Sequence, residues 1–284
     1  MADAARYHRL QLLLTLAGLG LSVAYLLALI VTDGGQALAR AAAGITPARW
    51  GQVALVALAL GAGQGVLGLP LRLIRGYWLP RRFELLHQPL AGWLGDQLKA
   101  ALIGWALGLA AVVGLGRTRR IILFDTLLAE FSPEEIESVL AHELGHHAHG
   151  DMRRGLLVNG ALTLVTAWLA ALALDGGVGI LGLAGPADPA GLPWLALVAL
   201  VLGLLQMPLA NGFSRWIERQ ADDFALATTG NASAFVGAME RLAGLNLAER
   251  RPSRLKEIVL YSHPALDRRI ARAAAAAANR GGIA

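Results

Sequence analysis

Two histidines and a glutamate near the middle of the chain have the residue types and the spacing of a metal site. They lie in the segment His142-Glu143-Leu144-Gly145-His146, which follows the pattern His-Glu-x-x-His. On an α-helix, residues four apart share one face, so both imidazoles can bind one zinc ion through neutral nitrogens. Zinc lowers the pKa of a bound water to about 7, and Glu143 is suited to take its proton as the oxygen attacks a peptide carbonyl. The pattern predicts zinc-dependent hydrolysis; a surface helix that happens to carry histidines is the alternative.

A catalytic zinc site needs a third protein ligand and keeps its fourth position for water. The chain has no cysteine, so this ligand must be His, Asp or Glu. The candidate is Glu218, and Asp222 lies one helical turn beyond it, where it can hydrogen-bond a ligating imidazole. Taken alone, these carboxylates fit the surface charges of an amphipathic helix equally well. Together with the histidine pattern, they favour Glu218 as the third ligand and Asp222 as the residue that supports a ligating imidazole.

The residues around the histidines favour a helix with a defined start and end. Ser132 is a suitable N-cap, and Glu135 three residues later completes a capping box. Gly150 is the expected stop. We expect this helix to present both imidazoles of the pattern, while His147 and His149 face solvent.

The composition places this site in a membrane protein. Of the 284 residues, 56% are hydrophobic and only 16% are charged, against about 25% charged in an ordinary soluble domain. A net charge of +5 does not indicate a nucleic-acid partner here, because Lys and Arg flank the apolar runs. A bilayer crossing takes about 20 mainly apolar residues. Four uncharged runs predict such membrane helices: residues 10–32, 50–71, 155–174 and 194–209.

The first of these runs also allows a second interpretation. Arg6 and Arg9 precede it, and residues 37–39 resemble a cleavage site, as in a secretory signal peptide. The apolar core of a signal peptide is only about 7 to 15 residues long. The length of the run therefore favours a membrane helix.

Basic residues predict which side of the membrane holds the zinc helix. A cluster follows the second run, and such clusters favour the cytoplasmic side. Its members are Arg72, Arg75, Arg81, Arg82 and Lys99. The loop over residues 175–193 has no Lys or Arg and is expected outside. We therefore predict a site that faces the cytoplasm, in a bacterial inner membrane, because the chain is rich in Ala, Gly and Arg.

A further apolar run, residues 100–116, is shorter and does not fit this topology. Lys99 precedes it, and Arg117, Arg119 and Arg120 follow it. If both flanks are cytoplasmic, a single crossing cannot join them. The run is then re-entrant, peripheral, or a helix whose returning partner is missing.

Four segments resemble one family, the integral-membrane zinc metalloproteases that include the CAAX prenyl endopeptidases and the HtpX-type heat-shock proteases. In family order they are GRTRRIILFDTLL (116–128), HELGHH (142–147), SRWIERQADDFAL (214–226) and YSHPALDRRI (261–270). The FDTLL and YSHP segments are more similar to the CAAX prenyl endopeptidase branch. The resemblance implies a membrane zinc endopeptidase of this type; an HtpX-like quality-control protease and an impaired zinc-binding relative are the alternatives.

Carried over residue by residue, the resemblance implies one zinc per chain held by His142, His146 and Glu218, with Glu143 as general base. It implies that Asp222 supports a ligand and that His263 stabilises the oxyanion. Arg269 either holds the carboxyl-terminal segment against the site or binds a substrate carboxylate. An extended substrate would add to an edge strand. That strand comprises Ile121, Ile122, Leu123 and Phe124.

The implied fold is an all-α integral membrane protein, a transmembrane bundle with a mainly helical, gluzincin-like domain that carries the short strand. Its partners would be the lipid bilayer and a peptide or protein substrate, membrane-associated or prenylated. The chain departs from the family because one membrane helix and the region before the edge strand are missing after residue 116. The expected divisions are 1–116 for the first membrane helices, 117–154 for strand and zinc helix, 155–213 for a membrane hairpin and 214–284 for a helical domain.

Overall fold

The computed structural model describes residues 2–97, 99, 130–245 and 248–281, and every regular element in these ranges is a helix. The all-α prediction is confirmed for this part of the chain. Two expectations, the apolar run 100–116 and the edge strand 121–124, lie outside the described residues.

In the described part of the chain, four helices are long and apolar enough to cross a membrane, and they coincide with the four runs predicted from the sequence. The chain is therefore an integral membrane protein. The first two helices are α1 (Ala2–Val31) and α3 (Arg49–Leu73), and the latter continues through a π-helical turn into α4 (Leu79–Arg82). The other two are α8 (Asp151–Ile180) and α9 (Leu192–Thr229).

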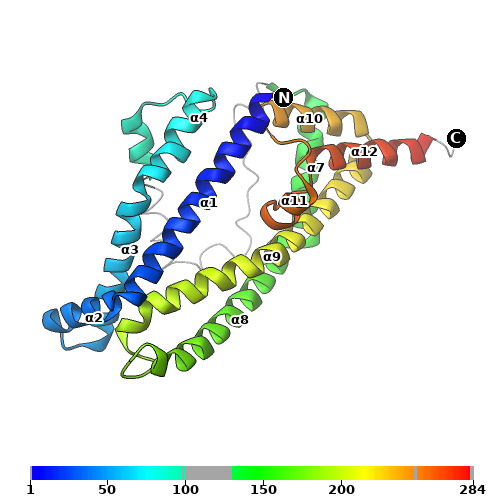
Figure 1. The fold of residues 1–284 in the computed structure, drawn as a ribbon. Coiled ribbons are helices and arrows are strands. Elements are labelled where there is room, and N and C mark those ends of the chain that lie inside the picture. The colour runs from blue at the N-terminus through cyan, green and yellow to red at the C-terminus, as the bar shows by residue number, and fades with distance from the viewer. Residues whose placement is uncertain (1, 98, 100–129, 246–247, 282–284) are drawn as a thin grey trace.

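The membrane helices form two pairs that come together at one end of the molecule (Figure 1). There the short helix α2 (Gly34–Ile45) packs against α3 and against a 3-10 turn, η2 (Pro189–Gly191), that leads into α9. Gly35 makes this contact possible, because a Cβ at this position would lie 2.5 Å from the carbonyl oxygen of Ala190.

The helix α9 continues from the membrane span into the region that carries the predicted third ligand. It runs without interruption from Leu192 to Thr229 and includes Pro208, Glu218 and Asp222. The expected boundary between residues 213 and 214 thus falls within one helix. A ligand on α9 is consequently attached rigidly to a membrane-spanning element.

The remaining helices pack around the end of α9 that is remote from α2 (Figure 1). They are α7 (Pro133–His149), α10 (Ala232–Leu245), α11 (Arg254–Leu260) and α12 (Leu266–Gly281). Their shared core is apolar and closely packed. It contains Ala141, Ala225, Leu226, Phe235, Met239 and Ala273.

Candidate metal centre

The helix α7 begins and ends at the residues that the sequence predicts. The Ser132 hydroxyl accepts from the Glu135 amide at 3.2 Å, and the Glu135 carboxylate accepts from the Ser132 amide at 2.9 Å. Gly150 ends the helix in the left-handed conformation, with φ 67°. Glu135 also accepts from the Arg241 Nε at 3.1 Å, so the capping residue anchors α10 as well. The histidine-bearing helix is therefore fixed at both ends.

A close contact between α7 and α9 brings the histidines towards the predicted third ligand. Gly145, between the two histidines, is buried against α9. A Cβ there would lie 3.0 Å from the Ala221 Cα and 3.1 Å from the Phe224 Cβ. A Cβ at this position would therefore be tighter than an ordinary contact, and glycine favours this close approach of the two helix backbones.

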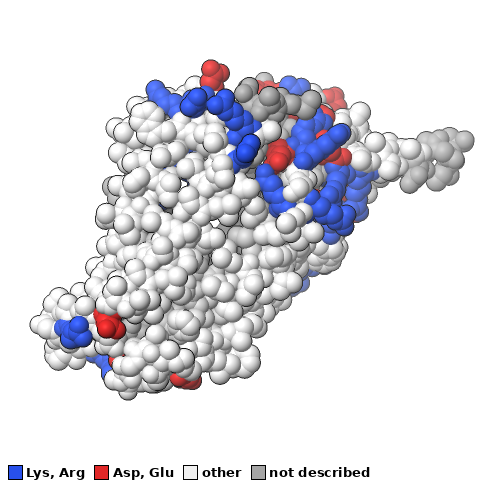
Figure 2. Space-filling view, in the orientation of Figure 1, with Lys and Arg blue, Asp and Glu red and all other residues white. Residues whose placement is uncertain are grey.

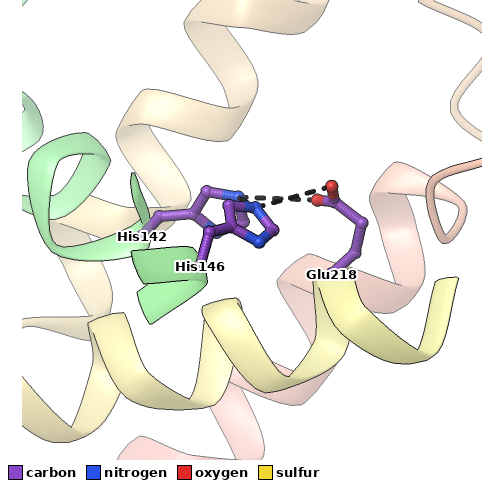
Figure 3. A group of neighbouring side chains, drawn as sticks. All are labelled: His142, His146 and Glu218. Carbon is purple, nitrogen blue, oxygen red and sulfur yellow. Dashed lines mark hydrogen bonds and ion pairs between the residues drawn. The ribbon is translucent and has the colours of Figure 1, made fainter. Parts of the chain in front are cut away.

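His142, His146 and Glu218 point towards one another across this contact (Figure 3). The two Nε2 atoms of the histidines are 3.2 Å apart. The Nε2 of His142 is 3.5 Å from the Glu218 Oε2, and the Nε2 of His146 is 3.7 Å from the Glu218 Oε1. One ligand atom from each residue lies within 4.8 Å of the others, the grouping that the sequence predicts.

The chemistry of this group fits a zinc ion. The Glu218 Oε2 is buried and has no hydrogen-bond partner in the described part of the chain. In a tetrahedral site with bonds of about 2.0–2.1 Å, two ligand atoms lie about 3.3 Å apart, close to the separation of the two histidine nitrogens. Two imidazole nitrogens and a carboxylate oxygen are the donors that zinc accepts in catalytic sites. A cation between them would satisfy all three.

Asp222 and Arg269 stand behind the first histidine. The Asp222 Oδ1 is 3.0 Å from the His142 Nδ1, but this nitrogen lacks the alignment of a full hydrogen bond. Arg269 donates to both carboxylate oxygens, from its Nε at 2.8 Å and its Nη2 at 2.5 Å. Because Arg269 lies on α12, this pair joins the carboxyl-terminal helix to the site. Two roles were expected for Arg269, and this contact supports the first, which is to hold the carboxyl-terminal segment against the site.

Burial and charge act in opposite directions on the pKa of His142. Burial lowers this pKa, but the carboxylates of Asp222 and Glu218 outweigh it and raise the pKa to about 9. Without a metal, His142 is therefore protonated at neutral pH. A metal that binds its Nε2 must displace a proton.

The second histidine is supported by a residue that the sequence reasoning missed. The His146 Nδ1 lies 3.0 Å from the Oδ2 of Asp151, a buried carboxylate at the start of α8. Asp151 comes directly after the glycine that ends α7. The sequence did carry a signal for this role, since Asp151 is an acidic residue five positions after His146.

His263 approaches the metal group from the turn after α11. Its Nε2 is 3.2 Å from the Glu218 Oε1, and its Nδ1 is 2.9 Å from the Ser262 hydroxyl. Its side chain is 59% exposed, so it borders both the ligands and solvent. Glu143 is also exposed, on the helix that carries both histidines. The predicted oxyanion donor thus lies beside the ligands, and the predicted base is exposed on the helix that carries both histidines.

Arg215, a second residue missed from the sequence, fixes the turn that carries His263. It is buried on α9, three residues before Glu218. It donates to the carbonyl oxygens of Glu257 at 2.8 Å, Ile258 at 3.2 Å and Tyr261 at 2.5 Å. These oxygens lie at the end of α11, so one helix positions both Glu218 and the His263 turn.

The two other histidines of α7 differ from each other. His147 is exposed, as expected. His149 is less exposed than expected: it is half-buried, its Nδ1 is buried, and its ring packs edge-on against Phe224, with 5.9 Å between the centroids. The close approach of α7 to α9 explains this burial.

An integral-membrane helical protein with two imidazoles and a carboxylate at one point has the ligand set of a zinc metallopeptidase. Residues 109–277, more than half of the chain, match the model of Peptidase family M48. The chain belongs to this family, whose metalloproteases use zinc.

Several bacterial proteins are similar to this chain. It is 33% identical over 168 residues to the "Uncharacterized metalloprotease YhfN" of Bacillus subtilis, covering 58% of this chain and 39% of that protein. It is 32% identical over 160 residues to "Protease HtpX" of Stutzerimonas stutzeri, covering 51% of this chain and 54% of that protein. The matches thus span about half of each relative or less.

Proposed function

We propose that this protein is a membrane-embedded zinc metalloendopeptidase that hydrolyses peptide bonds near the cytoplasmic face of a bacterial inner membrane. The observation that carries the proposal is the convergence of His142, His146 and Glu218 from two helices, with the exposed Glu143 directly following His142 in the chain. The three converging residues would hold one zinc ion. Family membership supports the reaction class.

In this proposal, bound zinc supplies a Lewis acid that polarises the scissile carbonyl and acidifies water. Glu143 accepts a proton from the attacking water and returns it to the leaving amine. His263 donates a hydrogen bond to the oxyanion, an interaction worth about 3 kcal/mol. Arg215 holds the turn that carries His263 in place, and Asp222 lies against the ring of His142. An extended substrate would lie along residues 121–124.

Charge supports the cytoplasmic orientation. Figure 2 shows Lys and Arg gathered at the end of the molecule that bears the helices around the candidate centre, with few at the opposite end. Arg40 is the one basic residue between α1 and α3, Arg49 is the first residue of α3, and the loop between α8 and α9 has no basic residue. This asymmetry follows the positive-inside tendency.

The absence of cysteine offers a clean test of orientation. Ser233→Cys at the start of α10 and Ala187→Cys in the loop before α9 introduce single thiols at exposed positions. In intact cells, a membrane-impermeant maleimide should label Ala187→Cys, and Ser233→Cys only after lysis. The reverse pattern would overturn the cytoplasmic assignment.

Two substrate classes follow from the proposal. Similarity to proteins named "Protease HtpX" favours quality control of membrane proteins. The FDTLL and YSHP segments favour a prenylated carboxyl terminus instead. Purified zinc-loaded protein should be given a destabilised membrane protein, a farnesylated CAAX peptide and the same peptide without its lipid. Cleavage of the membrane protein alone supports the first class, and dependence on the farnesyl group supports the second.

The competing proposal is that this protein binds zinc but has impaired turnover of substrate. It rests on one interpretation of the basic flanks of the run 100–116, in which the returning membrane helix is missing. Part of the substrate chamber would then be missing too. A topology reporter fused after Gly116 decides whether the run crosses. A cytoplasmic reporter means that the run does not cross, and an outer location would contradict the topology proposed above.

A further inference from the structure

Asp151 is a buried carboxylate without a role in the reaction described above. Its side chain is only 7% exposed. Burying a carboxylate is costly unless charged or hydrogen-bonding partners compensate. Its position at the first residue of α8, directly after the left-handed Gly150, turns this carboxylate back towards α7.

The best-placed partner of Asp151 is the ring of His146. The Asp151 Oδ2 lies 3.0 Å from the His146 Nδ1, with the geometry of a hydrogen bond. The Asp222 contact to the His142 Nδ1 is equally short but not aligned. A carboxylate on Nδ1 favours a proton there, which leaves the Nε2 lone pair directed at the metal group.

A second contact joins Asp151 to the helix that supplies the third ligand. The Arg154 Nη1 lies 3.5 Å from the Asp151 Oδ1 and donates to the Gln220 Oε1 at 3.0 Å. The Arg154 guanidinium also lies over the Trp216 ring, 5.5 Å from its centroid. Gln220 and Trp216 flank Glu218 on α9, so this arginine connects His146, through Asp151, to the Glu218 segment.

We propose that Asp151 is a positioning residue of the metal centre, which fixes the tautomer and the orientation of His146 and is itself held by Arg154. This inference rests on the zinc ligands of the proposed function but not on proteolysis. The site then has two carboxylates of matching function. Asp222 with Arg269 supports His142, and Asp151 with Arg154 supports His146.

The test measures zinc affinity by competition with a chelator, using the full-length protein in detergent. Removing a carboxylate that orients a ligating histidine typically costs 10–100-fold in metal affinity. Asp151→Ala should therefore bind zinc at least about tenfold more weakly than the wild type. Cobalt-loaded Asp151→Ala should also show an altered visible spectrum, because the ligand geometry changes. Asp223→Ala is the matched control, since Asp223 is an exposed carboxylate on α9 that pairs with Arg272.

Arg154→Met tests whether Arg154 acts on the metal centre through Asp151. It should weaken zinc binding in the wild type but have no further effect in Asp151→Ala, because Arg154 acts through Asp151. Additive losses would overturn that part of the proposal.

Zinc affinity of Asp151→Ala within about twofold of the wild type, with an unchanged cobalt spectrum, would overturn the positioning role. If Asp151→Ala does not fold, Asp151→Asn replaces it and is judged by the same limit. A wild type that binds zinc but cleaves nothing would refute the proposed function while leaving this test intact.

Discussion

At the residue scale, the candidate centre depends on charges that are buried in pairs. Asp222 contacts the His142 ring and is held by both donor groups of Arg269. The side chains of Asp222 and Arg269 are only 3% and 12% exposed. Removing one partner leaves the other charge uncompensated in a dry environment.

Arg269→Gln should therefore destabilise the metal-free protein by about 3–5 kcal/mol, the usual cost of breaking a buried ion pair. Thermal unfolding in detergent measures the effect. The control is Arg272→Gln, because Arg272 pairs with Asp223 at the surface and such pairs contribute at most about 1 kcal/mol. Similar losses in both variants would contradict the special position of the Asp222 pair.

His263 should affect turnover rather than metal binding. Its ring is 59% exposed and approaches Glu218 from the turn after α11. His263→Ala is expected to lower kcat about 10²–10³-fold, as the loss of one oxyanion donor does, while zinc content is kept. Loss of zinc in this variant would show that His263 acts on the ligands instead.

Sequence spacing was sufficient to predict which residues share a helix face, although it did not by itself join Glu218 to the histidines. The pair His142 and His146, the capping box and the pair Glu218 and Asp222 all follow from intervals of three or four residues. The carbonyl oxygens that Arg215 contacts are 42 to 46 residues away along the chain. Its role depends on how α11 packs on α9, which no local pattern encodes.

At the element scale, the site depends on how closely α7 approaches α9. Gly145 sets this separation, because a Cβ there would touch the backbone of Ala221. Neither the glycine alone nor the helix pattern predicted this contact, since the partner surface lies on another helix. The half-buried His149, with its buried Nδ1, is a consequence of the same contact.

Gly145→Val should push α7 away from α9 and weaken zinc binding, with a smaller effect for Gly145→Ala. Overpacking a tight contact typically costs about 1–3 kcal/mol, so a lower midpoint of thermal unfolding is also expected. Gly155→Ala is the control, because no atom lies within 4 Å of a Cβ at that position. Unchanged zinc affinity in Gly145→Val would mean that the helices tolerate a larger separation.

At the scale of the whole molecule, the membrane helices and the site form one structure. Composition and uncharged runs were sufficient to predict four membrane helices. The continuity of α9 from the bilayer into the metal group was not predicted, because the change from apolar to charged residues suggested a boundary between residues 213 and 214. A substrate at the membrane surface would therefore meet a site with one ligand, Glu218, fixed to a membrane helix.

The central claim is that this membrane site hydrolyses peptide bonds with Glu143 as the base. The most direct measurement compares zinc-loaded wild type with Glu143→Gln on an unstructured peptide, with zinc content measured in both. The wild type should cleave the peptide, and Glu143→Gln should retain one zinc per chain and lose about 10²–10⁴-fold in rate, the contribution of a general base. Equal rates in the two proteins, including no cleavage by either, would contradict the account.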